Sequence, residues 1–366
     1  MTRVSRLAAA SIMLLVTSMP TGLRAQPPQS PGEDLTIDGQ VRTRVLDGVI
    51  AALTEFYVFP DVAARMTDAI AQRRQRHEYD AITSARELAQ TLTTHLTEVS
   101  HDRHLRVNYS ASVLPPFPYP PPPPSPEQID RQRAALKQIN FGFEKVERLA
   151  GNIGYLDLRG FMPPTLMGET AAAAMTFLGG AQALIIDLRQ NGGGSPDGVA
   201  LMASYLFEQP VRMNDIYDRP SNETRQFWTL PYVAGQRFVG RDVYVLTSTR
   251  TFSAAEDFTY GVKNHKRATI VGEVTGGGAH PVGPRRIDDH FVVAVPMGRS
   301  ISSMTHTDWE GVGVEPDVKV SAPQALATAH LMALEKRLPA VTEPPMKTEI
   351  AAAIERLKKE LAQPKP

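Results

Sequence analysis

The chain has 366 residues, with 39 basic and 39 acidic side chains and no cysteine. Balanced charge without a basic tract disfavours nucleic acid and anionic membrane surfaces as partners. Without cysteine there is no disulfide framework, no cysteine nucleophile and no thiolate metal site. The length, with 42% hydrophobic residues, suffices for two or three domains with cores of their own.

The first 25 residues are typical of a secretory signal peptide. Arg3 and Arg6 precede an apolar run over residues 7–16, and small residues lead to a cleavage site after Ala25. The run is too short to span a bilayer, and no later stretch reaches the roughly 20 apolar residues of a transmembrane helix. The sequence therefore predicts an exported protein, periplasmic or extracellular, without stable membrane insertion.

Residues 34–110 are predicted to form an N-terminal helical bundle. An apolar stripe runs from Val41 to Leu53, and two further helices are expected over residues 62–76 and 85–96. The bundle ends in Asp102-Arg103-His104, which leads into an alternating strand over residues 105–109. Helices of this kind are packing elements, so chemistry is expected only at this end.

A proline-rich linker, residues 111–126, separates the bundle from the rest of the chain. Five consecutive prolines, 120–124, predict an extended polyproline conformation and a domain boundary. Residues 127–322 are predicted to form an α/β core, because strand and helix patterns alternate and residues 183–189 are almost continuously apolar. Residues 323–366 are predicted to form a C-terminal helical segment with a packing role.

A glycine loop, Gly192-Gly193-Gly194, follows the apolar strand of the core. A dinucleotide site would need a third glycine where Asp197 stands, and the chain has no Gly-Lys-Ser/Thr for a phosphate loop. Nucleotide binding is therefore not expected. The glycines are instead predicted to let backbone N–H groups approach a substrate carbonyl.

Ser253 follows an apolar strand, residues 243–246, and a short polar turn, and it begins a helix. Open α/β sheets bind ligands at this end of their strands. Ser253 and Glu256 have the spacing of a capping box, which alone would explain both residues. The alternative is a nucleophile whose oxyanion is stabilised by the free N–H of Ala254 at the positive end of the helix.

Four segments stand in a characteristic order: residues 187–194, 247–256, 267–277 and 311–317. Together they resemble the tail-specific, or C-terminal processing, serine peptidase family. The helical region resembles the N-terminal domain of the branch that contains interphotoreceptor retinoid-binding protein and the tricorn core protease. The resemblance implies a core of the ClpP/crotonase-like type and hydrolysis of peptide bonds through an acyl-enzyme, without a cofactor.

The family has two catalytic arrangements, and the sequence distinguishes them. In the processing branch a lysine acts as the base, but Gly278 stands at its position here. The resemblance therefore implies the tricorn-like arrangement, in which Ser253 is the nucleophile, His104 the base and Glu310 the assisting carboxylate. A neutral imidazole takes the serine proton, and a carboxylate stabilises the imidazolium.

The same resemblance places the oxyanion donors at the N–H of Ala254 and one N–H of the Gly192-Gly193 loop. His280 and Gly277, in the second glycine loop, are expected to contact the substrate.

In the tricorn-like pattern a serine precedes the catalytic histidine, and here Arg103 stands there. Ser100 and Asp102 remain candidates for the fourth member of the site. His101 is the competing base, and at a helix end it is more typical of an exposed histidine. A metal held by His101 and His104 is not expected, because the chain has no H-E-x-x-H motif and no cysteine.

Processing proteases usually carry a tail-binding PDZ domain between the histidine segment and the core. Residues 109–151 are too few to hold one, so no PDZ domain is predicted. The expected substrates are exported peptides or unfolded protein segments. A catalytically weak protein that binds apolar ligands on the same fold, and another serine hydrolase such as an esterase, are the alternatives. The sequence determines neither cleavage preference nor oligomeric state.

Overall fold

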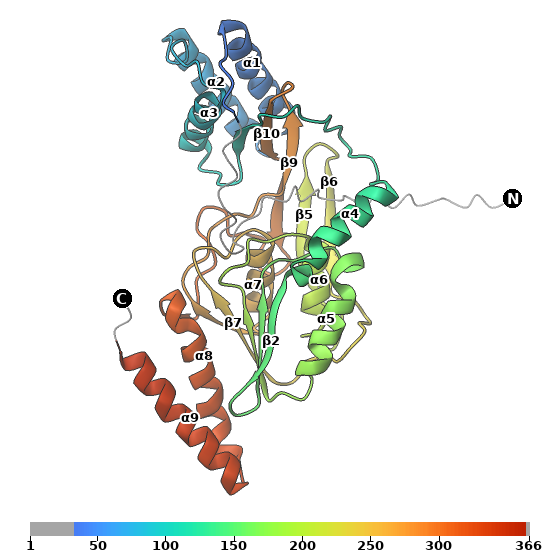
Figure 1. Ribbon diagram of the computed structural model, residues 1–366, viewed down its shortest axis with the longest axis vertical. Helices are drawn as coiled ribbons and strands as arrows, with labels where there is room; N and C mark the ends of the chain where they lie inside the picture. The colour runs from blue at the N-terminus through green and yellow to red at the C-terminus, as the bar shows by residue number, and fades with distance from the viewer. Residues whose placement is uncertain (1–32, 364–366) are drawn as a thin grey trace, which may run out of the picture.

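The computed structural model describes residues 33–363 and has three parts: a helical unit, an α/β core and a pair of C-terminal helices (Figure 1). This arrangement confirms the predicted fold class. The predicted signal peptide, residues 1–25, lies outside the described residues. Within residues 33–363, none of the helices has the length and apolarity needed to cross a membrane.

The N-terminal unit contains the three predicted helices, α1 (Gly39–Phe56), α2 (Pro60–Gln75) and α3 (Ala85–Ser100). Their apolar stripes face one another, and Val49 and Leu53 of α1 are fully buried. These helices form where the sequence repeats apolar residues at helical spacing.

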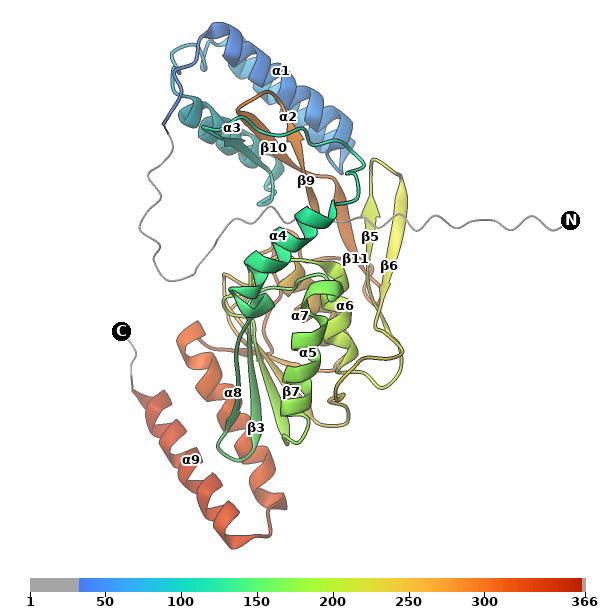
Figure 2. The ribbon, with the colours of Figure 1, turned by 45° about the vertical axis from the view of Figure 1, so that its right-hand side comes forward.

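A three-stranded antiparallel sheet completes this unit, in the order β1 (Arg106–Tyr109), β10 (Phe291–Pro296), β9 (Val282–Arg286). Val107 of β1 stands opposite Val293 of β10, and the inward residues of β10 join the core of the helices. Figure 2 shows β9 and β10 beside α1–α3. Two of the three strands therefore come from the distant second half of the chain, which the pattern of residues 34–110 could not indicate.

The proline-rich linker runs in extended form from β1 to helix α4 (Pro126–Lys137), with no intervening domain. Tyr119 anchors it: its ring packs edge-on against Phe56, and its hydroxyl donates to Asp218 at 2.7 Å. The guanidinium of Arg285 lies 4.0 Å from the Phe56 ring centre and 4.7 Å from that of Tyr119. Tyr119 thus attaches the linker both to the N-terminal unit, through Phe56 and Arg285, and to Asp218 outside it.

The core is built on a six-stranded sheet. Its strands, in spatial order, are β12 (Val318–Lys319), β8 (Thr269–Gly272), β7 (Asp242–Thr247), β4 (Ala183–Asp187), β3 (Ile153–Leu158) and β2 (Phe143–Leu149). Only β2 pairs antiparallel.

Helices cover both faces of this sheet, as the continuous apolar pattern of β4 requires. Leu184 and Ile186 face one helical layer, and Ala183 and Ile185 face the other. The first layer consists of α5 (Pro164–Leu178), α6 (Pro196–Ser204) and α7 (Ala254–Asn264), and the second of α8 (Ala322–Arg337) and α9 (Pro344–Ala362).

A small antiparallel sheet flanks α7, in the order β11 (Gly298–Ser302), β5 (Arg212–Asp218), β6 (Glu223–Trp228). In the main sheet, β4 and β7 are parallel neighbours, with Asp187 opposite Leu246. Their carboxyl ends lie at one level, so the loop after β4 and the turn after β7 meet. These two connections carry the first glycine loop and Ser253.

Candidate active site

Ser253 occupies a sharp turn between β7 and α7. Its backbone angles are φ 55° and ψ −122°, a region that serine rarely adopts. Two hydroxyls hold the turn to the end of β4: Ser248 Oγ donates to the carbonyl of Arg189 at 2.6 Å, and Thr251 Oγ1 donates to that of Leu188 at 2.8 Å. The neighbouring strand thus fixes the strained conformation that places Ser253 at the start of the helix.

Glu256 is a fully buried carboxylate that joins the start of α7 to the second glycine loop. It accepts hydrogen bonds from the N–H groups of Ser253, Gly277 and Gly278 at 2.8, 2.6 and 2.8 Å, and from the Thr275 hydroxyl at 2.5 Å. Burial raises the pKa of the Glu256 carboxyl, and these four donors oppose the rise.

The capping interpretation accounts for Glu256 but not for the Ser253 hydroxyl. The carboxylate does reach back to the Ser253 N–H, as a capping box predicts. The N–H of Glu256, which a capping hydroxyl would accept, instead donates to the Ser253 carbonyl at 2.8 Å.

Gly193 lies directly against the nucleophile candidate. A Cβ on Gly193 would be 2.8 Å from the Ser253 Cβ and 2.9 Å from the Ala254 nitrogen, and its φ of 107° also favours glycine. The N–H of Gly193 donates to Asn191 Oδ1 at 2.8 Å. Within residues 33–363, the N–H groups of Gly192 and Ala254 have no such acceptor. Of the three predicted oxyanion donors, these two are available to a substrate.

His104 enters the site from the N-terminal unit, between α3 and β1. Its ring packs against Phe252 at an angle of 35°, with centroids 4.5 Å apart, and a Cβ on Gly278 would lie 2.5 Å from its Cε1. Burial lowers the pKa of the His104 imidazole to about 4, so the ring is neutral at physiological pH. Its Nδ1 is buried and has no hydrogen-bond partner in the described part of the chain.

Asp102 connects His104 to two further side chains. Its Oδ1 accepts the His104 N–H at 3.0 Å, and its Oδ2 accepts from Nδ1 of His280 at 2.6 Å and from the Tyr57 hydroxyl at 3.2 Å. Oε2 of Glu310 lies 3.5 Å from the same His280 nitrogen. Asp102 is 1% and His280 5% exposed, so the imidazole lies buried between two carboxylates.

Of these two carboxylates, Glu310 accepts fewer hydrogen bonds. Its Oε2 accepts the Ala279 N–H at 2.5 Å, while Oε1 is buried without a partner among residues 33–363. Burial and the Asp102 charge raise the pKa of Glu310 to about 7. For His280, burial lowers the pKa, but the hydrogen bond and charge of Asp102 outweigh it, and the net pKa is raised.

Three other predicted residues are not part of the lining of the pocket beside Ser253. His101 is exposed and caps α3 in a left-handed conformation with φ 56°. His280 packs its ring edge-on against Phe59 at 5.4 Å, and Gly277 uses its N–H to bind Glu256. The pocket beside Ser253 is bordered by residues next to these two, Gly278 and Ala279.

Arg103 has a contact that sequence reasoning missed. Its Nη1 donates to the carbonyl of Gly276 at 2.5 Å, and its guanidinium lies 5.9 Å from the Phe252 ring centre. At the position where the tricorn-like pattern has serine, this arginine ties the histidine segment to the second glycine loop. The only sequence signal was that a charged residue departs from the pattern.

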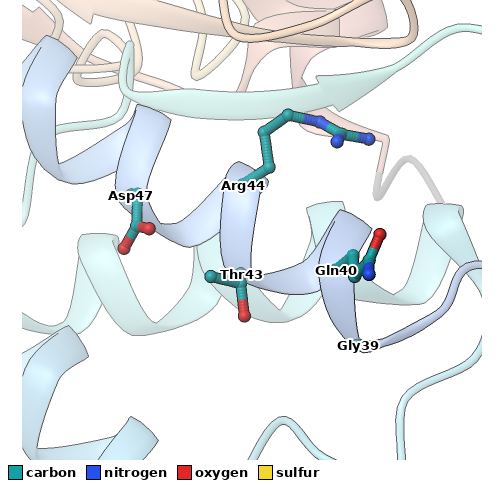
Figure 3. A pocket seen from close by; sticks show the side chains of 5 residues that line it. All are labelled: Gly39, Gln40, Thr43, Arg44 and Asp47. Atoms are coloured by element: carbon teal, nitrogen blue, oxygen red, sulfur yellow. The ribbon is translucent and has the colours of Figure 1, made fainter.

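A small pocket of about 30 Å³ opens beside Ser253. Its lining comprises Gly194, Pro196, Ile216, Ser253, Ala254, Asp257, Gly278, Ala279, Pro281, Ser300 and Trp309. The two glycine loops, the start of α7 and the small sheet thus converge on one hollow. A second hollow lies on the exposed side of α1 (Figure 3), and its charged groups, Arg44 and Asp47, are paired with Asp288 and Arg74.

Asp102, His280 and Glu310 are also the one group in the described chain whose ligand atoms, within 4.8 Å of one another, could hold a metal ion. The 2.6 Å hydrogen bond from His280 Nδ1 to Asp102 requires a proton on that nitrogen. A metal ion would have to displace it. The raised pKa of His280, caused by the hydrogen bond and charge of Asp102, favours the protonated imidazolium, which cannot ligate a metal ion.

Two protein-family models match most of this chain. Residues 152–320 match Peptidase family S41, and residues 38–146 match the N-terminal domain of Peptidase S41 in eukaryotic IRBP. The chain is 28% identical over 173 residues to carboxyl-terminal-processing peptidase 2, chloroplastic, of Arabidopsis thaliana, covering 45% of this chain and 31% of that protein.

Two further comparisons extend this result. The carboxyl-terminal-processing protease of a Synechocystis species is 27% identical over 173 residues, or 47% of this chain and 39% of that protein. The chain thus spans about a third of the length of the curated relatives that it matches. A Parabacteroides merdae structure described as a peptidase superposes with a TM-score of 0.53 at 19% identity, covering 88% of this chain and 99% of that one, which shows a shared fold.

Proposed function

Because the chain belongs to peptidase family S41, we propose that it is a serine peptidase that cleaves peptides or unfolded protein segments through an acyl-enzyme. One observation carries the proposal: Ser253, from the core, and His104, from the N-terminal unit, converge on Gly278. A strained serine with an adjacent free N–H, beside a neutral buried imidazole, is what acyl transfer requires.

In the proposed mechanism, the Ser253 hydroxyl gives its proton to Nε2 of His104 as its oxygen attacks the substrate carbonyl. The N–H groups of Ala254 and Gly192 stabilise the resulting oxyanion. The imidazolium then gives the proton to the leaving amine, and the acyl-enzyme forms. A water molecule, deprotonated by the same imidazole, releases the acyl group.

Glu310 is proposed to stabilise the imidazolium. Nδ1 of His104 and Oε1 of Glu310 are both buried without partners among the described residues, and both side chains border the Gly278-Ala279 segment. Catalytic hydrogen bonds are often incomplete in a free enzyme and form with bound substrate. We infer that these two atoms pair, directly or through a water, during the reaction.

Asp102 is proposed as the fourth member of the site. It accepts the His104 backbone N–H and, through His280, connects that residue to Glu310. Of the two candidates from the sequence, Ser100 accepts the backbone N–H of Asp102 at 3.2 Å and interacts with the Tyr57 hydroxyl, and it makes no hydrogen bond to His104 within residues 33–363. His280 is therefore assigned as a positioning residue that keeps two carboxylates close together, since a protonated imidazole offsets their repulsion.

The ligand-binding alternative has less support. Sites for small apolar ligands usually enclose about 300–1,000 Å³. The pocket beside Ser253 measures about 30 Å³ and includes a carboxyl group in its wall. Export to the periplasm or the exterior remains part of the proposal and rests on the signal-like pattern of residues 1–25.

Labelling with a fluorophosphonate probe tests the proposal. The full chain without its first 25 residues should be labelled, whereas Ser253→Ala should not be labelled and should unfold at nearly the same temperature. Loss of a helix cap alone would cost about 1 kcal/mol. A folded wild-type protein that resists labelling and hydrolyses no peptide would reject the peptidase assignment.

A further inference from the structure

The pocket beside Ser253 contains an acidic group that the proposed mechanism does not use. Asp257 lies four residues after Ser253, about one helical turn further along the same face of α7. Its side chain borders the pocket together with Ile216 of β5 and Ser300 of β11. A substrate residue held at Ser253 would therefore extend its side chain towards this carboxyl group.

Asp257 is 7% exposed and forms no ion pair within residues 33–363. Its Oδ1 accepts a short hydrogen bond from Nδ2 of Asn214. Burial raises the pKa of the Asp257 carboxyl to about 6, so the group is mostly ionised at neutral pH. A buried carboxylate without a cation is unfavourable, and a ligand that supplies one recovers the lost free energy.

Asn214, the hydrogen-bond partner of Asp257, carries an unsatisfied acceptor of its own. Its side chain is 1% exposed, and Oδ1 has no hydrogen-bond partner in the described part of the chain. The donors of the amide are directed at Asp257, at its Oδ1 and its backbone carbonyl, so the acceptors of the pair exceed its free donors. An ammonium group carries three donors and one positive charge, and the charge complements the carboxylate.

The dimensions of the pocket restrict which cation can enter. The pocket is small, at about 30 Å³. Such a space accepts an unbranched chain more readily than the planar guanidinium fork of arginine. The remaining wall is largely apolar, with Ile216, Pro281 and Trp309, and suits the methylene groups of a lysine side chain.

We propose that this pocket binds the side chain of a lysine in the substrate, at the residue whose carbonyl group Ser253 attacks. The inference rests on the proposed peptidase function and deepens it by naming the substrate class. A carboxylate near the nucleophile selects basic residues in the same way in other serine proteases. Peptides with a neutral isostere at this position lack the charge and leave Asp257 unpaired.

The test compares peptides that differ only at this residue: lysine, norleucine, arginine and alanine. For the wild-type protein we expect kcat/KM for lysine to exceed that for norleucine by on the order of 10²-fold. In Asp257→Asn this ratio should fall to near one, because the charge that distinguishes lysine from norleucine is gone. Glu315→Gln, which removes an exposed carboxylate, should keep the lysine preference.

A second measurement needs neither turnover nor the Asp257 variant. Calorimetry on Ser253→Ala should detect binding of n-butylammonium and none of n-butanol. If fluorophosphonate labels Ser253 but norleucine or alanine peptides are cleaved as well as lysine peptides, only this inference fails. If labelling fails, the peptidase proposal fails, and n-butylammonium binding still decides whether the pocket is a cation site. Absence of that binding would overturn the inference.

Discussion

The two sides of the candidate site differ in how completely their polar groups are paired. On the nucleophile side, the Glu256 carboxylate accepts four hydrogen bonds and holds Ser253 against the second glycine loop. On the base side, His104 Nδ1 and Glu310 Oε1 are buried without partners in the described chain. The residues of the first side all come from the α/β core, whereas the second side combines His104 of the N-terminal unit with Glu310 of the core.

This difference indicates that one side is rigid in the free protein and that the other changes its hydrogen bonds when substrate binds. Buried polar groups whose hydrogen bonds are all formed make a rigid network. A buried polar group without a partner costs free energy, and this cost is removed when substrate binding supplies the partner. We expect the nucleophile side to be pre-organised in the free protein. The base side should complete its hydrogen bonds when the substrate arrives.

The largest effect is expected from His104→Ala. Without the base, kcat should fall by on the order of 10⁴- to 10⁶-fold, as in other enzymes that lose this role. Steady-state hydrolysis and fluorophosphonate labelling measure the loss. His101→Asn is the matched control, because it removes an exposed histidine three residues away and asparagine tolerates the left-handed conformation. An equal loss in the control would contradict the choice of His104.

Glu310→Gln should lower kcat by about 10²- to 10⁴-fold, because the amide cannot stabilise an imidazolium by charge. In the wild-type protein kcat/KM should rise with pH through about 7, where Glu310 ionises, since His104, with a pKa near 4, is already neutral. In Glu310→Gln, kcat/KM should not show this rise near pH 7. A wild-type limb near pH 4 would show that ionised Glu310 is not required.

The same substitution has a stability readout that needs no activity. The folded-state pKa of Glu310 is raised, so its stabilising contribution is present below its unfolded pKa of about 4.3 and is lost as the pH rises through about 7. Wild-type unfolding temperature should therefore fall relative to Glu310→Gln between pH 5 and pH 8. Glu315→Gln, at an exposed site, should show no such trend.

Glu256→Gln tests the paired side. The amide can accept through one oxygen only and brings two donors to a site full of donors, so the free energy of unfolding should drop by about 2–4 kcal/mol. Chemical denaturation measures this change. Glu273→Gln, a partly buried glutamate that accepts the Ala322 N–H, is a comparison with fewer donors. If the free energy of unfolding falls less in Glu256→Gln than in Glu273→Gln, the four hydrogen bonds of Glu256 do not make the nucleophile side especially rigid.

The smallest effect is expected from His280→Asn. The asparagine Nδ2 can replace the donor to Asp102 but carries no positive charge, so kcat should fall by about 10- to 100-fold while KM changes little. His280→Ala should lose more, and the acid limb near pH 7 should move upward in both. A rise in KM at constant kcat would instead indicate that His280 contacts the substrate.

Local patterns in the sequence predicted much of the core. The apolar run at residues 243–246 lies within β7, the helix starts after Ser253, and residues 183–187 form the buried strand β4. Such elements depend on side chains close in sequence, by alternation, helical periodicity and capping. The candidate nucleophile and its glycine loops could be located for this reason.

Other parts had no local signal. The short strands β5, β6, β9 and β11 follow no clear alternation, and α8 spreads its alanines on all sides. The predicted boundaries of the domains, such as residues 34–110 for the first, remain predictions. The sheet that joins β1 to β9 and β10 depends on pairing between distant strands, which no window of sequence contains.

The sequence by itself determined the set of chemical groups: a serine at a helix start, a histidine after a helical bundle, and a glutamate before the last motif. Tertiary structure decided how they connect. Asp102 and His280 are 178 residues apart and form a 2.6 Å hydrogen bond, and Arg103 reaches Gly276 across 173 residues. Burial and pKa depend on such contacts, because charge is tuned by whatever surrounds a group in space rather than by its neighbours along the chain.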